Sequence, residues 1–419
     1  MLNSKLNYTT KQYERLKREV EFLFGRKIIS TKDCEQLQQE IKDFSLTASL
    51  GLNTIRRCFN IIKTETALSQ YTLDVFSNYC GYENYNHFLS TPSKSKNYQE
   101  PLNLSLIETL YRESVDDVDS SIFTKLHLEI FEAILTNPKV FQSVFPKLVH
   151  YPVFQEYVLS FHPLIDKLNQ EWYMRAIRVF TKRSNIIHLK VFGLAMDFLR
   201  LFLNSELEKC KPLVDEMTKL EDQLLVEYPL VVWPQARLFS SAYIYYNYIG
   251  NKSLANNYKQ KIKHNSFTSH SAGKKTLQQV QENSYDFLMC VCDYLSLAGD
   301  YEFVGQLLED FGASFKNGHS PTSRLYKPYK VIVEILKAEY FFYSGYKQEA
   351  KEIMKQVELS NLTFEFKNFY TLRYLLLQME SSKDQSATKF KNLKKQSTTL
   401  IKQLGYKRFQ KQLNTMLKK

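Results

Sequence analysis

Apolar residues recur every three or four positions along most of the chain, which is the spacing of an amphipathic helix. A helix is expected within the first 25 residues, where the apolar positions are Tyr13, Leu16, Val20 and Leu23. The segment TKDCEQLQQEIKDF predicts a second helix, for which Ser30 or Thr31 can serve as the N-cap. A third is expected from Leu52 to Lys63, and a fourth begins near Ser69 and ends at Gly81. The short segment ENYNHFL closes this group of helices.

A polar segment bounded by proline, TPSKSKNYQEP, covers residues 91–101 and predicts a linker after a helical domain at residues 1–90. Beyond it, three segments resemble one another: an aromatic-rich helix, a turn at glycine, and a second amphipathic helix. Their turn glycines are Gly250, Gly299 and Gly345, and a fourth unit turns at Asn204. Glycine or asparagine is expected where the chain leaves a helix with positive φ. We therefore expect a domain of repeated helical hairpins over residues 102–382.

Composition agrees with an all-α chain. The 419 residues include only 12 Gly and 11 Pro, too few for many tight turns. The chain contains no apolar run long enough for a membrane span and no signal-peptide core at its start, so we expect a cytoplasmic protein without membrane contact.

The net charge of +12 is distributed unevenly. Residues 383–419 hold ten Lys and one Arg against one Asp, and residues 1–98 carry a net charge of +4. Such a basic balance favours polyanionic partners. We expect residues 383–419 to form a capping helix with a solvated basic face; a second contact with nucleic acid or with an acidic partner is the alternative. The apolar face of this helix would comprise Phe390, Leu393, Leu400, Ile401 and Leu404.

The segment GLNTIRRCFNIIK has the pattern of a nucleic-acid reading helix. Its residues Ile55, Phe59 and Ile62 fall on one helix face and would anchor the helix to its own domain. Arginine can bind guanine through two hydrogen bonds, asparagine can bind adenine in the same way, and lysine or threonine can bind phosphate. The candidate DNA-binding residues are Asn53, Thr54, Arg56, Arg57, Asn60 and Lys63.

The order of segments resembles the helix-turn-helix of the lambda-repressor-like family. The matching parts are Thr54–Ile55, the loop ETALSQ, Thr72–Leu73 and Cys80–Gly81. The N-terminal segment also resembles that of helical-repeat regulators from Bacteroidetes, which implies a bacterial transcription regulator. Seven residues, SLTASLG, separate the second and third helices, whereas the standard motif uses three or four.

The third hairpin segment resembles the tetratricopeptide repeat. The matching positions are Ala338, Tyr340, Gly345, Tyr346 and Ala350. This resemblance implies a tetratricopeptide-like α-solenoid with a concave groove. The combination of such a body with a repressor-like head is similar to the peptide-sensing regulators of Gram-positive bacteria, which implies a peptide or protein in the groove and a homodimer. Candidate groove residues are Tyr243, Tyr246 and Asn247, for which core packing is the open alternative.

No catalytic pattern is present, and we expect no enzyme activity, cofactor or metal. The six cysteines lack the spacing of a zinc site, and no paired histidine motif occurs. The segment Ser271–Thr276 is not a phosphate loop, because that motif needs glycine where Thr268 stands and serine or threonine where Lys275 stands. The sequence therefore predicts a DNA-binding regulator; the alternative is a protein-interaction scaffold. The first requires Arg56 and Arg57 to lie exposed with Lys63, whereas pairing of these arginines with the acids Glu19, Glu21 or Asp43 favours the scaffold.

Overall fold

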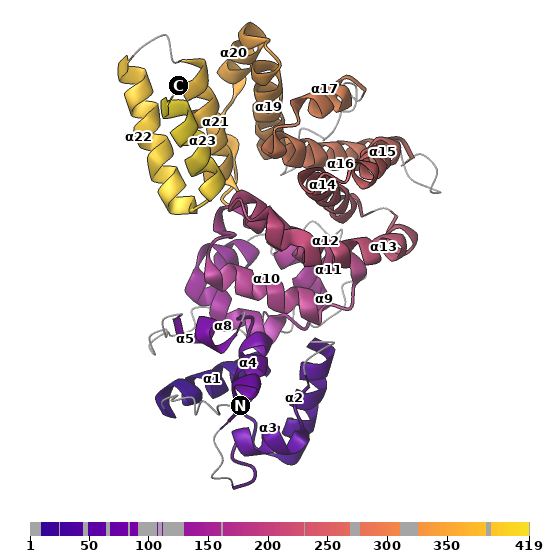
Figure 1. Cartoon of the computed structure of the whole chain (residues 1–419), viewed down its shortest axis with the longest axis vertical. Coiled ribbons are helices and arrows are strands. Elements are labelled where there is room, and N and C mark those ends of the chain that lie inside the picture. Colours follow the sequence, from indigo (N-terminus) through magenta and orange to yellow (C-terminus); the bar gives the residue numbers. More distant parts are fainter. Residues whose placement is uncertain are drawn as a thin grey trace. The chain divides into compact units, whose positions relative to one another are not determined.

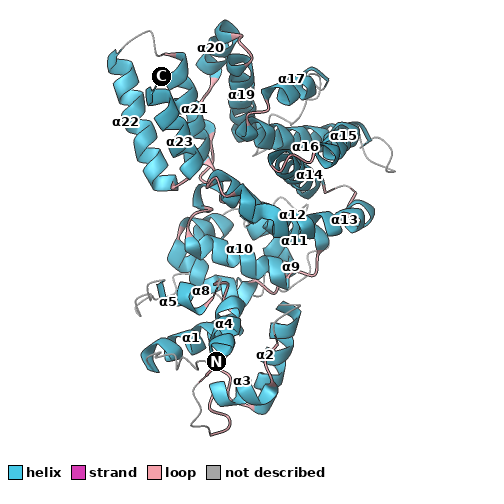
Figure 2. Ribbon diagram, viewed as in Figure 1, coloured by secondary structure: helices cyan, strands magenta, loops and turns pink. Residues whose placement is uncertain are grey.

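The chain is all-α in the part that the computed structural model describes (Figures 1 and 2). That part comprises residues 10–24, 26–44, 49–63, 68–82, 84–90, 107, 111, 130–160, 162–229, 231–268, 277–310, 326–382 and 387–418. The chain divides into two compact units, which we describe separately. Unit 1 contains Met1–Phe161 and Glu171–Asn185, and unit 2 contains His162–Gln170 and Ile186–Lys419. The linker predicted at residues 91–101 lies outside the described residues. Among the described helices, none combines the length and the apolar character needed to cross a bilayer.

Unit 1 begins with the helices predicted from the sequence. Its elements are α1 (Thr10–Phe24), α2 (Thr31–Phe44), α3 (Leu52–Cys58), α4 (Gln70–Tyr79), α5 (Tyr85–Ser90), α8 (Pro138–Leu148), α9 (Pro152–Phe154), η1 (Gln155–Ser160) and α10 (Glu171–Arg183). Helix α1 packs against α4 and α8, and α2 packs against α3, α4 and α10. The core of this unit therefore combines the N-terminal helices with α8 and α10.

Local signals in the sequence explain where these helices begin and end. Ser30 Oγ accepts a hydrogen bond from the Asp33 amide at 3.2 Å, and the Asp33 carboxylate accepts one from the Ser30 amide at 3.0 Å. This reciprocal pair caps α2, as the sequence predicts. After α4, Gly81 adopts φ 83°, and a Cβ there would lie 2.7 Å from Arg175 Cγ. Both the backbone conformation and the close approach of α10 require glycine at this position.

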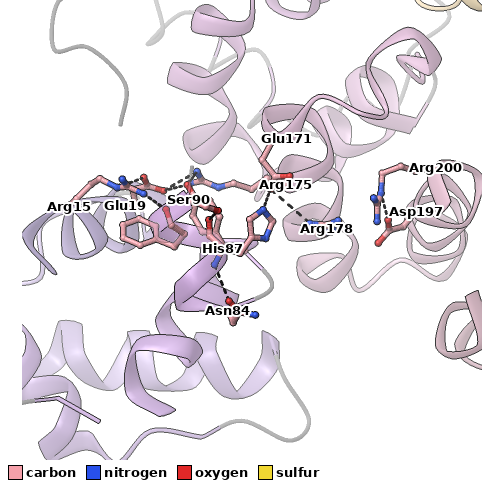
Figure 3. Close-up of polar contacts among 12 residues, drawn as sticks. Arg15, Glu19, Asn84, His87, Ser90, Glu171, Arg175, Arg178, Asp197 and Arg200 are labelled. Atoms are coloured by element: carbon pink, nitrogen blue, oxygen red, sulfur yellow. Dashed lines mark hydrogen bonds and ion pairs between the residues drawn. The ribbon is translucent and has the colours of Figure 1, made fainter. Parts of the chain in front are cut away.

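Ion pairs join α10 to the N-terminal helices. Arg175 Nη1 lies 2.9 Å from the Glu19 carboxylate (Figure 3). It also donates a hydrogen bond to the Tyr82 hydroxyl at 2.7 Å. His87 of α5 lies 3.7 Å from the Glu171 carboxylate at the start of α10. The N-terminal helices thus share a polar interface with a helix that begins eighty positions beyond α5.

Unit 2 is a series of helical hairpins. Its elements are η2 (Ile165–Lys167), α11 (Ile187–Leu203), η3 (Leu207–Cys210), α12 (Lys211–Lys219), α13 (Glu221–Glu227), α14 (Val232–Tyr248), α15 (Lys252–Thr268), α16 (Leu277–Ala298), α17 (Tyr301–Asp310), α19 (Tyr326–Tyr343), α20 (Lys347–Gln356), η4 (Leu359–Asn361), α21 (Lys367–Ser381), α22 (Ala387–Leu404) and α23 (Lys407–Lys418). Antiparallel partners are α14 with α15, α16 with α17, and α19 with α20. The first helices also pack on one another in the order α11, α14, α16, α19, α21. Each hairpin therefore buries its apolar stripe against the next.

The predicted hairpin turns have the expected backbone conformation, with one correction. Gly250, Gly299 and Gly345 adopt φ angles of 75°, 82° and 95°. In the fourth unit Asn204 has φ −86°, and the left-handed residue is Ser205 with φ 59°. The amide of Ser205 bonds the Phe202 carbonyl at 3.0 Å, the same pattern as Gly299 with Ser296. The side-chain amide nitrogen of Asn204 instead donates a hydrogen bond to Asn169 Oδ1.

The basic C-terminal segment forms two helices, α22 and α23, where the sequence analysis expected one. The break lies at Gly405, which adopts φ 73°. Within α22, Leu393, Ile401 and Leu404 are buried, as expected, whereas Phe390 and Leu400 are half-buried. The lysines of α22 are exposed, in agreement with a solvated basic face.

Candidate nucleic-acid interface

Helix α3 is attached to unit 1 by one apolar side. Ile55 and Cys58 are fully buried, and Phe59, which directly follows the helix, lies edge-on to Phe76 of α4 with ring centroids 5.9 Å apart. The Tyr13 hydroxyl donates a hydrogen bond to the Cys58 carbonyl at 2.6 Å, so the end of α3 is also joined to α1. This anchoring leaves the opposite side of a short, fixed helix free to contact a ligand.

The third helix ends earlier than the sequence analysis expected. It was predicted to reach Lys63, but α3 stops at Cys58. Asn60 adopts φ 59°, its amide bonds the Arg57 carbonyl at 3.1 Å, and the Ile61 amide bonds the Arg56 carbonyl at 2.8 Å. This is a Schellman ending with asparagine in the left-handed position, which asparagine tolerates better than other side chains.

Because α3 ends at Cys58, the helix face predicted from the sequence is only partly correct. The predicted face of Ile55, Phe59 and Ile62 is correct for the first two residues, whereas Ile62 lies beyond the helix and is half-buried. Asn60 and Lys63 are exposed but also lie beyond the helix, so they belong to the turn that follows it. Helix α3 therefore contains four of the six candidate residues.

Those four side chains differ in solvent exposure and in hydrogen bonding. Asn53 and Arg57 are exposed, whereas Thr54 and Arg56 are half-buried. Arg56 Nη1 donates a hydrogen bond to Asn53 Oδ1 at 3.2 Å, and its Nε atom is buried without a hydrogen-bond partner among the described residues. The Arg56 guanidinium is thus held along the helix surface, and Arg57 is the arginine that projects from it.

The nearby acids are engaged elsewhere. Glu19 pairs with Arg15 and Arg175, and Glu21 lies 3.4 Å from Lys27. The side chain of Asp43 lies outside the described residues. Over the described part of the chain, Arg57 makes no ion pair, so its charge is available to an external anion.

The start of α4 contributes a residue that the sequence analysis missed. Tyr71 is 52% exposed, and its hydroxyl lies 3.2 Å from the amide nitrogen and 3.3 Å from the carbonyl oxygen of Ser49. It therefore spans the gap between α4 and the residues that lead into α3. The Thr72–Leu73 pair beside it is buried, with the Thr72 amide bonded to the N-cap Ser69 at 3.2 Å. The signal for Tyr71 was an aromatic residue one position outside the apolar face of α4.

The candidate groove residues of unit 2 divide between packing and exposure. Tyr243 is 7% exposed, and its hydroxyl donates a hydrogen bond to Asp300 at 2.6 Å, which agrees with the packing alternative. Tyr246 is half-buried and stacks on Tyr258 of α15 with ring centroids 5.8 Å apart. Asn247 is exposed. Of the three, Asn247 has the most surface available to a partner.

The cysteines and acids of the described residues provide no metal centre. No group of three or more His, Cys, Asp or Glu side chains there is arranged to hold a metal ion. All six cysteines are buried thiols. Burial raises the pKa of Cys58 to about 11 and that of Cys290 to about 12, so both thiols are protonated at neutral pH.

Comparison of the chain with protein-family models, with curated proteins and with solved structures gives no match.

Proposed function

We propose that this chain is a DNA-binding transcription regulator that acts in the cytoplasm. In this proposal α2 and α3 form a helix-turn-helix-like head, and the hairpins of unit 2 form a tetratricopeptide-like solenoid that binds a peptide or protein partner. The head would contact DNA in a homodimer. The observation that carries the proposal is Arg57, which is exposed on the opposite side of α3 from buried Ile55 and Cys58 and forms no ion pair with the described residues.

The exposed side chains of α3 are of the types that can contact base edges in a DNA groove. Arg57 can donate two parallel hydrogen bonds to guanine or bind a phosphate, and the amide nitrogen of Asn53 can donate to a base edge. Lys63 is exposed in the turn and can contact the phosphate backbone. A helix of 7 residues spans about 10 Å, which is enough for base contacts over about three base pairs.

DNA that co-purifies with the full chain, once sequenced, supplies the probe for a binding test. Fluorescence anisotropy with that DNA would compare the wild type with Arg57→Gln. We expect Arg57→Gln to weaken specific binding by about 1–3 kcal/mol, and we expect wild-type affinity to fall steeply as salt rises. Arg18→Gln is the matched control because it removes the same charge from an exposed position on α1.

Two results would overturn the proposal. One is the recovery of no specific DNA. The other is an equal loss of affinity in Arg57→Gln and Arg18→Gln, because this would reduce the contact to general charge.

The second candidate function is a protein-interaction scaffold. It is favoured by two exposed apolar side chains of unit 1, Phe22 at 44% and Ile29 at 78% exposed, and by the bond that occupies Arg56 with Asn53. A protein partner would bury such side chains. If a partner protein binds the chain with an affinity that Ile29→Ser lowers and Arg57→Gln leaves unchanged, the scaffold function is supported instead.

A further inference from the structure

Unit 2 contains a cavity of about 440 Å³ whose lining is mostly polar. The cavity lies where α16, α19, α21 and α23 approach one another and where the turn before α17 passes. Its lining includes Ser296, Tyr301, Tyr343, Arg408, Lys411 and Gln412. A volume of this size falls within the range of small-molecule sites.

One wall of the cavity is a buried ion-pair cluster that is already satisfied. Arg373 of α21 donates to Glu339 of α19 from Nε at 3.0 Å and from Nη2 at 2.5 Å, and it also pairs with Asp293 of α16. The Arg373 side chain is only 2% exposed. Two carboxylates face this single guanidinium and more than offset its charge, so this wall is fixed and does not itself require an anionic ligand.

Arg408 of α23 differs from Arg373. Its guanidinium lies over the Phe202 ring at 4.5 Å and donates a hydrogen bond to the Leu297 carbonyl, but it pairs with no carboxylate among the described residues. A guanidinium has five N–H donors, so one carbonyl leaves most of them available. Burial lowers the pKa of Arg408, and the charge of Arg373 lowers it further. The group stays protonated at neutral pH because arginine loses its proton only far above that range.

Lys411 adds a second cation to the same end of the cavity. It lies three positions after Arg408 on α23, on the same helix side, and it is exposed and forms no ion pair with the described residues. Within the described part of the chain, neither of these two cations forms an ion pair with a carboxylate; Glu339, which also lines the cavity, is paired with Arg373. An anion bound there would gain charge-assisted hydrogen bonds in a partly dehydrated setting.

The opposite wall supplies an aromatic surface. The rings of Tyr301 and Tyr343 stack with centroids 4.5 Å apart and an interplanar angle of 19°. Burial raises the pKa of both hydroxyls above their ordinary value, so both are neutral. The Tyr343 hydroxyl donates to Glu380 at 2.8 Å, which fixes the ring. Both tyrosines, with Gln412 and Thr415, also line a second cavity of about 280 Å³.

We propose that this cavity binds a small organic oxyanion, a molecule with one carboxylate or phosphate group. The oxyanion contacts Arg408 and Lys411, and the organic part lies against Tyr301 and Tyr343. A purely structural role for Arg408, as a cap on the last turn of α16 through Leu297, accounts for one of its donors. It accounts neither for Lys411 nor for the open volume beside both cations.

The test uses the full chain and titrates it by calorimetry at low ionic strength with phenyl phosphate, with benzoate and with the uncharged benzyl alcohol. We expect at least one of the two anions to bind saturably and benzyl alcohol to bind far more weakly. Arg408→Gln should weaken anion binding about tenfold or more, because hydrogen bonds between charged groups are the strong ones. Lys411→Gln should weaken it by a smaller factor.

Lys418→Gln is the matched control, since it removes the same charge from an exposed position of α23 outside the cavity. Circular dichroism shows whether Arg408→Gln still folds. If it does not, the test relies on Lys411→Gln, which changes an exposed residue. The proposal is overturned if neither anion binds, or if Lys411→Gln and Lys418→Gln have equal effects. Because no DNA is present, this result is independent of the DNA-binding proposal.

Discussion

The guanidinium of Arg183, at the end of α10, lies 3.2 Å from the carboxylate of Glu40 in α2. The hydroxyl of Tyr79 completes the cluster: it donates to Glu40 at 2.5 Å and lies 2.7 Å from Arg183. A second nitrogen of Arg183 donates to the Leu23 carbonyl at 3.2 Å, at the end of α1. One side chain from beyond the predicted linker therefore ties together three helices of the N-terminal head.

Replacing Arg183 with methionine should destabilise unit 1. The Arg183 side chain is 10% exposed and Glu40 is 36% exposed, so the pair lies between a buried and a surface ion pair. We expect a loss of about 1–3 kcal/mol in unfolding free energy, because Glu40 and Tyr79 lose a charged partner. Urea unfolding measures this loss.

A double-mutant cycle with Glu40→Gln would separate the pair from the other bonds of Arg183. Arg18→Met is the control for loss of an exposed guanidinium from unit 1 and should change stability little. A coupling energy near zero between Arg183 and Glu40 would contradict the role assigned to the pair.

Ser69 should be needed for the stability of α4. Its side chain accepts a hydrogen bond from the Thr72 amide at 3.2 Å, and the residue has the extended backbone of an N-cap, φ −75° and ψ 155°. Ser69→Ala removes that acceptor and should cost about 1 kcal/mol, whereas Ser69→Asp keeps an acceptor and should stay near wild type. Thermal unfolding followed by circular dichroism compares the three proteins. Equal melting temperatures for Ser69→Ala and wild type would show that the cap contributes nothing.

Asp166 should make the unfolding free energy of unit 2 depend on pH. Its carboxylate accepts hydrogen bonds from the Asn368 and Phe369 amides, each at 2.8 Å, at the start of α21. Burial nevertheless dominates and raises the pKa of Asp166 from 3.8 to about 6. The folded state therefore holds this proton at pH values where the unfolded chain has lost it.

The sign follows from this difference in proton binding. Between about pH 4 and pH 6 the unfolded state binds fewer protons at this site, so the contribution of Asp166 to stability falls as pH rises. The change across this window amounts to roughly 3 kcal/mol at most. Asp166→Asn cannot titrate, so the free-energy difference between wild type and this variant should change over the window. Parallel pH profiles of urea unfolding for the two proteins would contradict the raised pKa.

Much of the local structure could be predicted from sequence because its causes are local. The cap formed by Ser30 and Asp33 lies within four residues, and the turn at Gly299 follows from one glycine placed after an amphipathic run. The end of α3 was also visible in principle, since Asn60 is a residue that tolerates positive φ. The apolar spacing that continues to Ile62 hid this signal, because spacing alone does not say where a helix stops.

Long-range polar contacts could not be predicted. Arg183 and Glu40 lie 143 positions apart, and Arg373 and Glu339 lie 34 apart on different helices. A charged residue at a given helical position fits an exposed face or a buried pair equally well until its neighbours are known. The cavity beside Arg408 could not be predicted for the same reason, because it depends on how four helices from different hairpins approach one another.

Asn60 offers a way to separate helix termination from base recognition. Since Asn60 ends α3 in the left-handed conformation, Asn60→Gly should preserve stability, whereas Asn60→Ala should cost about 1 kcal/mol. If the side chain of Asn60 serves only this turn, Asn60→Gly should also keep the specific DNA affinity that Arg57→Gln loses. Urea unfolding and fluorescence anisotropy on the same preparations give both quantities. Loss of specific binding in Asn60→Gly at unchanged stability would instead assign Asn60 a direct contact with DNA, and the reading surface would then extend from α3 into the turn that follows it.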